Sequence, residues 1–219
     1  MQFLLCNGSP RGKTGNSERI IDGLAEGLNA HENILIEKVL LNRTNEHSEA
    51  AARLAGADCA IIVFPLYTDA MPGMVMAFFE ELTPHIGSLS NLSLGFIVQS
   101  GFPEKIQSLA VEKYLERLTE LLGARYSGTA IFGGGMGMRK KRMELIRELG
   151  ASFVPGLAFD PVLLERTTGF VRLSPVGSKV MGVVASTALL QTPWIRSLKA
   201  NGAYGKRDAR PYEPQPPHL

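Results

Sequence analysis

The stretch NGSPRGKTGNS, residues 7–17, follows the apolar run QFLLC at residues 2–6 and precedes a segment of helical periodicity at residues 17–28. Its eleven residues exceed the about 2–6 that usually connect a strand to a helix. Arg11 and Lys13 are its cations, and Gly, Ser, Thr, Asn and Pro fill most other positions. Such a loop offers backbone N–H groups and hydroxyls to an anion, and the next helix presents the positive end of its dipole there. The stretch therefore predicts a strand, an anion-binding loop and a helix.

A phosphomonoester fits this loop better than a pyrophosphate, because no GxGxxG pattern is present. The Walker pattern is absent too, since Gly8 and Gly12 lie too close together for it. The alternative is a polar surface loop in which Asn16 or Ser17 merely caps the helix. Capping and phosphate binding can occur at one helix start, so this alternative does not exclude a phosphate site.

Apolar runs alternate with segments of helical periodicity over about the first 150 residues, the pattern typical of βαβ units and a parallel sheet. Strands are expected at residues 2–6, 34–41, 59–64, 92–99 and 126–132. Helices are expected at residues 17–28, 49–57, 71–82, 106–122 and 138–149. This alternation predicts an α/β fold with a doubly wound, five-stranded parallel sheet, and its length suits the flavodoxin-like strand order 2-1-3-4-5. Periodicity by itself does not supply the order.

The chain divides into an expected α/β domain at residues 1–151 and an extension at residues 152–219. The extension is expected to hold one apolar helix near residues 180–195 and a proline-rich tail at residues 211–217. The apolar segment is shorter than the ~20 residues that span a bilayer, and polar residues interrupt it. We therefore expect no membrane span, but a helix packed on the domain or on a second subunit.

Composition narrows the class of protein. Hydrophobic residues at 45% and charged residues at 20% indicate a globular protein with a substantial core. A net charge of +2 gives no general reason to expect nucleic acid. Cys6 and Cys59 lie in apolar runs, which predicts reduced core thiols, and no signal peptide is recognisable, so a cytoplasmic location is expected.

Two further loops are expected beside the first. In open α/β sheets ligands bind beyond the carboxyl ends of the strands, where the loops after strands one, three and four converge. In the loop PLYTDAMPG at residues 65–73, Leu66 and Tyr67 would form a wall for a flat ring, with backbone hydrogen bonds near Thr68. In the loop QSGFPE at residues 99–104, a glycine would allow close approach to a ring edge. Taken singly, each loop is also compatible with ordinary packing or an ordinary turn.

The first and second loops both resemble sequence motifs of one known protein family. NGSPR at residues 7–11 with GNS at residues 15–17 closely resembles the GSPR…GNS phosphate loop of the NADPH-dependent FMN reductase family. PLY at residues 65–67, with MPG at residues 71–73 and FF at residues 78–79, is similar to that family's P-x-Y…xPG…xxF element. The resemblance covers about the first 150 residues, although the third loop lacks the Gly-Gly pair common in the reductases.

The resemblance implies a flavodoxin-like fold with one FMN per subunit in a homodimer or homotetramer. It also implies reduction by NADPH or NADH, with electrons passed to a quinone, an azo or nitro compound, or free flavin. By position, the residues that would hold the phosphate are Ser9, Arg11, Asn16 and Ser17. The residues that would line the flavin ring are Pro65, Leu66, Tyr67 and Thr68. The far edge of the ring would contact Ser100, Gly101 and Phe102.

FMN would carry the chemistry itself, so no catalytic His, Cys or carboxylate is expected, and all four histidines fall outside the three loops. Related iron–sulfur flavoproteins carry a cysteine cluster after the second strand. Residues 42–50 hold no cysteine, so no cluster or other metal is expected. The basic run RKKR at residues 139–142 is either a solvated helix start or a site for a nicotinamide 2′-phosphate.

Two alternatives stay open. One is an FMN-binding electron-transfer protein without nicotinamide turnover, although such carriers are typically smaller and more acidic. The other is a non-flavin α/β protein that binds a different phosphate ester.

Overall fold

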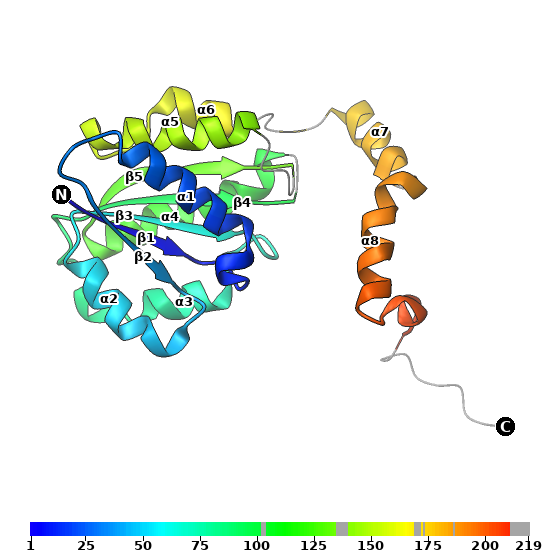
Figure 1. Cartoon of the computed structure of the whole chain (residues 1–219), viewed down its shortest axis with the longest axis horizontal. Coiled ribbons are helices and arrows are strands. Elements are labelled where there is room, and N and C mark those ends of the chain that lie inside the picture. The colour runs from blue at the N-terminus through cyan, green and yellow to red at the C-terminus, as the bar shows by residue number, and fades with distance from the viewer. Residues whose placement is uncertain (102–103, 135–139, 169–171, 173, 186, 211–219) are drawn as a thin grey trace. The chain divides into compact units, whose positions relative to one another are not determined.

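The structure is a computed structural model that describes residues 1–101, 104–134, 140–168, 172, 174–185 and 187–210 (Figure 1). The chain forms two compact units, Met1–Arg172 and Leu173–Leu219. The first unit thus continues past residue 151, which lies within a helix, α5 (Lys140–Gly156). This helix extends beyond the segment at residues 138–149 in which one was expected.

A five-stranded parallel sheet forms the centre of the first unit, in the order β2-β1-β3-β4-β5 (Figure 1). The strand order predicted for a flavodoxin-like fold is confirmed. Parallel neighbours need crossover connections, which the intervening helices supply. The strands are β1 (Gln2–Asn7), β2 (Leu35–Leu40), β3 (Cys59–Pro65), β4 (Ser93–Gln99) and β5 (Arg125–Phe132).

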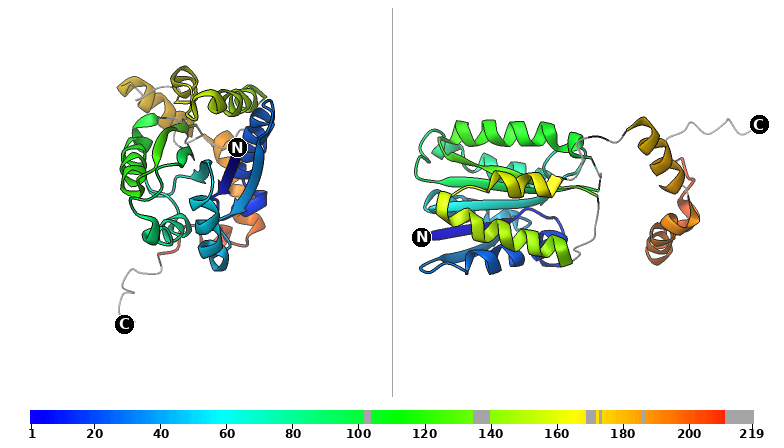
Figure 2. Two further views of the ribbon diagram at one scale, coloured as in Figure 1. Left: turned by 90° about the vertical axis from the view of Figure 1, so that its left-hand side faces the viewer. Right: turned by 90° about the horizontal axis from the view of Figure 1, so that it is seen from above.

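Helices cover both faces of this sheet (Figures 1 and 2). One face is covered by α1 (Asn16–Leu28), α5 and α6 (Pro161–Thr168), and the other by α2 (His47–Ala55), α3 (Gly73–Glu80) and α4 (Leu109–Leu122). Successive side chains of a strand point to opposite faces, so β1 contributes to both cores. Leu4 and Cys6 pack on the α2–α4 side, and Phe3 and Leu5 on the α1–α5 side. All four are fully buried, as expected for a central parallel strand.

Both cysteine thiols lie in these cores, as the apolar runs around them predict. Cys6 and Cys59 are buried and form no disulfide. Burial raises the pKa of the Cys6 thiol to about 12 and that of Cys59 to about 11, because a thiolate is poorly solvated in an apolar interior. The two thiols therefore behave as small apolar side chains.

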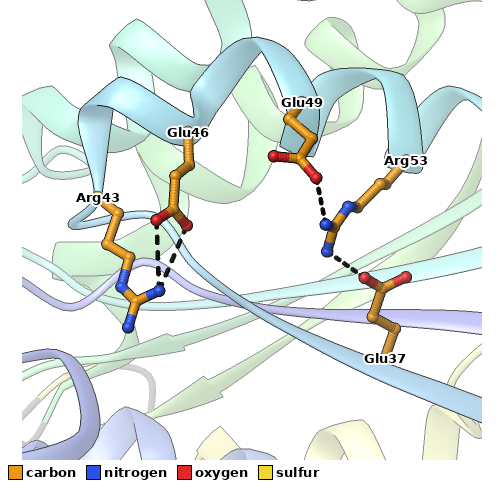
Figure 3. A network of polar contacts seen from close by, with 5 residues as sticks. All are labelled: Glu37, Arg43, Glu46, Glu49 and Arg53. Carbon is orange, nitrogen blue, oxygen red and sulfur yellow. Dashed lines mark hydrogen bonds and ion pairs between the residues drawn. The ribbon is translucent and has the colours of Figure 1, made fainter.

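Strand β2 forms one edge of the sheet and carries charged side chains there. Its Glu37 pairs with Arg53 of α2, which also pairs with Glu49 one helical turn away (Figure 3). Nearby, Arg43 Nη1 lies 3.3 Å from Glu46 Oε1. Exposed ion pairs add little stability, but charge along an edge strand opposes pairing with a further strand.

The second unit contains two helices where one was expected. The prediction of a single helix at residues 180–195 is wrong: α7 (Pro175–Ala185) ends before α8 (Ala188–Ala200) begins. Thr187 separates them, because its extended backbone (φ −69°, ψ 144°) cannot continue a helix and serves as the N-cap of α8. A short 3₁₀ turn follows at Tyr204–Lys206. The expected tail at residues 211–217 lies outside the described residues. Among the helices of the described chain, none is long and apolar enough to cross a membrane.

Candidate functional site

The loops after β1, β3 and β4 meet at the carboxyl edge of the sheet, where the strand order reverses between β1 and β3. Together they surround one pocket with a volume of about 150 Å³. Its lining residues are Ser9, Arg11, Asn16, Pro65, Leu66, Tyr67, Gln99, Ser100 and Gly101. Tertiary structure therefore brings together three segments that are far apart in the sequence.

Eight of the eleven residues proposed from the sequence line this pocket: Ser9, Arg11, Asn16, Pro65, Leu66, Tyr67, Ser100 and Gly101. Ser17 and Thr68 do not line it, and Phe102 lies outside the described residues. Gln99 lines the pocket without having been proposed. Its signal in the sequence is a polar residue that ends an otherwise apolar central strand, at the edge where ligands bind.

Asn7, the last residue of β1, folds the first loop back over the strand end. Its Nδ2 donates to Glu18 Oε2 at 2.7 Å and to the carbonyl oxygen of Gly12 at 3.2 Å. Its Oδ1 accepts from the backbone N–H of Ser9 at 3.0 Å. Because Asn7 is only 1% exposed, it positions the loop and leaves ligand contacts to other residues.

The glycines of the first loop keep the space beside Ser9 open. Gly12 has a φ of +52°, a conformation that favours glycine. A Cβ built on Gly15 would lie 2.9 Å from Ser9 Oγ and 3.3 Å from Arg11 Cβ. A side chain at Gly15 would thus fill the cradle next to the Ser9 hydroxyl, as expected of a loop that admits a phosphate group.

Helix α1 begins at this cradle without a side-chain cap. Its N-cap is Gly15, so the alternative that Asn16 or Ser17 caps the helix is wrong. Without a side-chain cap, N–H groups of the first turn remain available to an anion, and the helix dipole favours negative charge there. The hydroxyl of the fully buried Ser17 accepts from Gln99 Nε2 at 2.7 Å. Because a hydroxyl can accept and donate at once, its proton remains available.

The second loop makes a tight turn that presents Tyr67. Tyr67 and Ala70 exchange backbone hydrogen bonds of 3.0 and 3.1 Å, while Thr68 and Asp69 have φ values of 50° and 61°. Positive φ is uncommon outside glycine, above all for a β-branched residue such as Thr. Strained turns of this kind occur at functional sites. Thr68 lies at the tip, and the Tyr67 ring, 46% exposed, stands beside the pocket.

Backbone contacts fix the second and third loops to the sheet and to α4. The N–H of Leu66 donates to the carbonyl oxygen of Gln99 at 2.8 Å, and the N–H of Ser100 to that of Phe132 at 2.9 Å. The N–H of Met71 donates to the Tyr114 hydroxyl at 3.0 Å, and burial raises the pKa of that phenol. The pocket walls are therefore held by two main-chain bonds and one bond from the main chain to a side chain.

Gly101 leaves open space in the third loop. A Cβ added there would meet no heavy atom within 4 Å. Among the described residues there is therefore room for a Cβ at this position, and a ligand in the pocket would compete with a side chain for that space.

The basic run at residues 139–142 contains one cation with a structural contact. Arg142 Nη2 donates to the carbonyl oxygen of Gly133 at 2.8 Å, and its guanidinium lies 5.7 Å from the centroid of the Phe132 ring. Lys140 and Lys141 are exposed at the start of α5, and Arg139 lies outside the described residues. This arrangement accords with a solvated helix start.

None of the histidines within the described part of the chain lines the pocket. His31 Nε2 donates to the carbonyl oxygen of Ala151 at 2.7 Å, and His47 Nε2 lies 2.7 Å from the carbonyl oxygen of Leu41. Both therefore have structural contacts. His218 lies outside the described residues.

No protein-family model matches the chain, and no curated protein matches it either. Solved structures do resemble it. An FMN-dependent NADH-azoreductase from Bacillus anthracis, in complex with FMN, has a TM-score of 0.56 at 16% identity, over 72% of this chain and 100% of that one. An NADH:FMN oxidoreductase in its apo form has a TM-score of 0.60 at 15% identity, over 80% and 97% of the two chains.

A short-chain flavodoxin associated with a bacterial microcompartment has a TM-score of 0.52 at 14% identity, over 71% of this chain and 97% of that one. At such identities the likeness establishes the fold alone. The class of protein defined so far is a flavodoxin-like α/β domain with a cationic loop and an aromatic wall around one pocket.

Proposed function

We propose that the protein is an FMN-dependent NAD(P)H oxidoreductase that passes electrons to a small acceptor such as a quinone, an azo or nitro compound, or free flavin. One observation carries the proposal: a single pocket joins a hydroxyl-bearing, cationic loop at a helix start to an apolar and aromatic wall. The loop suits a phosphate, and the wall suits a flat amphipathic ring.

The phosphate would be held on the α1 side of the pocket. Ser9 and Asn16 offer polar side chains there, and Arg11 offers a full positive charge. Ser17, which lies behind the lining residues, would donate its hydroxyl proton while it accepts from Gln99. Arginine suits this role because its planar guanidinium matches a phosphate with two parallel hydrogen bonds.

The ring would lie against the second and third loops. Pro65, Leu66 and Tyr67 form the wall, and Ser100 with Gly101 meets the far edge, while Thr68 would contribute only through the backbone of its turn. A pocket that encloses a ligand has about 300–1,000 Å³, which exceeds the 150 Å³ found here. A flavin held here would therefore keep part of its surface accessible to nicotinamide and acceptor.

FMN, when bound, supplies two-electron chemistry, taking a hydride from NAD(P)H and passing electrons onward. The chain's part is to bind and orient the cofactor. No side chain in the pocket needs to act as an acid or a base for this reaction.

Three considerations support an enzyme over an electron carrier. The loop motifs resemble those of FMN reductases, and two of the similar structures are named as an NADH-azoreductase and an NADH:FMN oxidoreductase. The chain is also near neutral, with a net charge of +2, and carries a second unit, unlike small acidic carriers. The similar flavodoxin structure keeps the carrier as the second candidate.

Anaerobic reduction separates the candidates. The protein loaded with FMN is mixed with NADH or NADPH without oxygen, and the visible absorbance of the flavin is followed. Bleaching within minutes, with recovery after a quinone is added, supports the reductase. A protein that holds FMN but is not bleached by either nucleotide is a carrier, and failure to take up FMN contradicts both flavin proposals.

We further propose a homodimer or homotetramer, as the family resemblance implies, in the cytoplasm, as the two reduced core thiols suggest. Sedimentation velocity of the purified chain measures the number of subunits. A monomer at micromolar concentration would contradict this part of the proposal.

A further inference from the structure

The segment that contains both helices of the second unit has an unusual charge. The 42 residues between Glu165 and Asp208 include seven lysines and arginines but no aspartate or glutamate. The rest of the chain mixes both signs, and its exposed cations commonly pair with carboxylates, as Arg53 does with Glu49. Arg166 pairs with Glu148 and Arg207 with Asp208. Lys179, Arg196 and Lys199, however, lie at least nine residues from any acidic residue in the sequence, so this part of the segment suits an anionic partner.

Helix α7 carries an apolar face in this basic segment. Val176, Val180, Val183 and Val184 are exposed by 71%, 57%, 69% and 43%. Their spacing of four, seven and eight residues places them on one side of the helix. Lys179 lies at the margin of the same face, where a long side chain can bury its stem and keep its charge in a polar layer. Exposed apolar surface of this kind marks an interaction site.

Helix α8 adds an aromatic side chain among further cations. Trp194 is 67% exposed, and Arg196 and Lys199 are exposed on the same helix. Beyond the helix, the Tyr204 ring lies 5.1 Å from Lys199 Nζ and 4.3 Å from Arg207 Cζ. Aromatic rings together with lysine and arginine are enriched where protein meets the boundary between lipid and water.

We propose that the second unit binds the surface of membranes that contain anionic lipids. The valine face of α7 and Trp194 enter the boundary between headgroups and acyl chains, and the lysines and arginines contact lipid phosphates. Because neither helix is long enough to span a bilayer, the unit lies on the membrane surface. This inference rests on the second unit alone and does not depend on the proposed FMN chemistry.

Two other binding partners of the second unit, a second copy of the unit and a nucleic acid, fit its surface less well. A second copy of this unit would bring like charges together, since both copies lack acidic residues over the same segment, and like charges repel. A nucleic acid would match the cations, but its phosphates would make no use of the exposed valines. An anionic lipid surface matches both features at once.

The chain's single tryptophan reports directly on the second unit. We expect that adding vesicles of phosphatidylglycerol and phosphatidylcholine to the full chain shifts the emission of Trp194 to shorter wavelength, and that the protein sediments with the vesicles. Pure phosphatidylcholine vesicles should bind much less, and salt should weaken binding to the anionic ones. The result should be the same with and without FMN.

Charge-reversal variants make the test specific. One lysine or arginine near an anionic surface strengthens binding about five-fold, so Lys179→Glu, Arg196→Glu and Lys199→Glu combined should weaken it more than a hundred-fold. The matched control is Arg117→Glu on α4, whose side chain is 78% exposed in the first unit, and it should leave vesicle binding unchanged.

Three outcomes would overturn the proposal. Equal binding to neutral and anionic vesicles would show that the cations do not contribute to binding. Absence of binding to any vesicle would show that the second unit does not bind membranes. Emission that is already at short wavelength without vesicles, and unchanged by them, would place Trp194 against protein. Diluting the protein would then distinguish two cases. Contact with a second copy would be lost on dilution, whereas contact within one chain would persist.

Discussion

Gln99 Nε2 donates a hydrogen bond of 2.7 Å to Ser17 Oγ, which joins the carboxyl end of β4 to the first turn of α1. The two residues lie 82 positions apart in the sequence. Gln99 lines the pocket, whereas Ser17 lies behind it and is fully buried. The bond fixes the Ser17 oxygen, and the hydroxyl can still donate its proton; we propose a ligand phosphate as the acceptor.

This relationship predicts unequal effects of two substitutions on FMN affinity. Ser17→Ala removes the donor and should weaken FMN binding about three- to ten-fold, the value of one hydrogen bond. Gln99→Met removes the group that orients the hydroxyl and keeps a side chain of similar length in the pocket lining, so it should weaken binding less. The double variant should bind no more weakly than Ser17→Ala, because the partners act as one unit. Titration of flavin fluorescence measures each affinity, and additive losses would contradict the assignment.

Arg11→Ala should weaken FMN binding about ten- to a hundred-fold, since it removes a charge-assisted hydrogen bond to the phosphate. Riboflavin, which lacks the phosphate, should bind the variant and the unaltered protein equally. Lys13 is in the same loop but does not line the pocket, so Lys13→Ala is the matched control and should change affinity less. Equal losses for FMN and riboflavin would refute the phosphate role of Arg11.

Gly101→Val should weaken FMN and riboflavin alike, because the added side chain enters space that the ring edge would occupy. The described residues leave room there, since a Cβ at Gly101 meets none of their heavy atoms within 4 Å outside its own chain neighbours. The midpoint of thermal unfolding should therefore stay unchanged. Unaltered affinity for both flavins would show that the ring lies elsewhere.

His31 supports α5 at a position where the helix lacks its own donor. Pro155 has no N–H for the carbonyl oxygen of Ala151, four residues earlier, and His31 Nε2 donates to that oxygen at 2.7 Å. We expect His31→Ala to lower the free energy of unfolding by about 1 kcal/mol. In a Pro155→Ala background the helix supplies its own N–H, so the cost should shrink. Denaturant unfolding of the unaltered protein, the two single variants and the double variant measures the coupling, and an equal cost in both backgrounds would argue against it.

The two buried thiols predict a dependence of stability on pH. Burial raises the pKa of Cys6 to about 12 and that of Cys59 to about 11, from an ordinary value of 9.0. The unfolded chain therefore releases these protons at lower pH than the folded chain does. The free energy of unfolding should fall as pH rises from about 9 towards 12, and the fall should be smaller for Cys6→Ala. Chemical denaturation across this pH range measures it, and an unchanged slope in that variant would contradict the contribution of Cys6.

The strand order shows how far the sequence reaches. Alternating apolar and helical segments predict the five strands and the helices between them, because parallel strands buried on both faces are apolar throughout. The order 2-1-3-4-5 came from the length of that alternation and is confirmed. The sequence does not predict the two helices of the second unit: apolar composition continues through residues 180–195, whereas the extended backbone of Thr187 precedes α8 as a separate helix.

The sequence alone determined that an unusually long, polar loop with Arg11 lies between a strand and a helix, and it predicts an anion site there whatever the rest of the chain does. Tertiary structure decided which other residues share that site. Contacts such as Gln99 with Ser17 form only when separate strands end at one edge, and no local pattern encodes that proximity. Contacts within helices depend in the same way on neighbours: α5 continues through Pro155, and His31, more than a hundred residues earlier, donates to the Ala151 carbonyl oxygen that Pro155 leaves without an intrahelical donor.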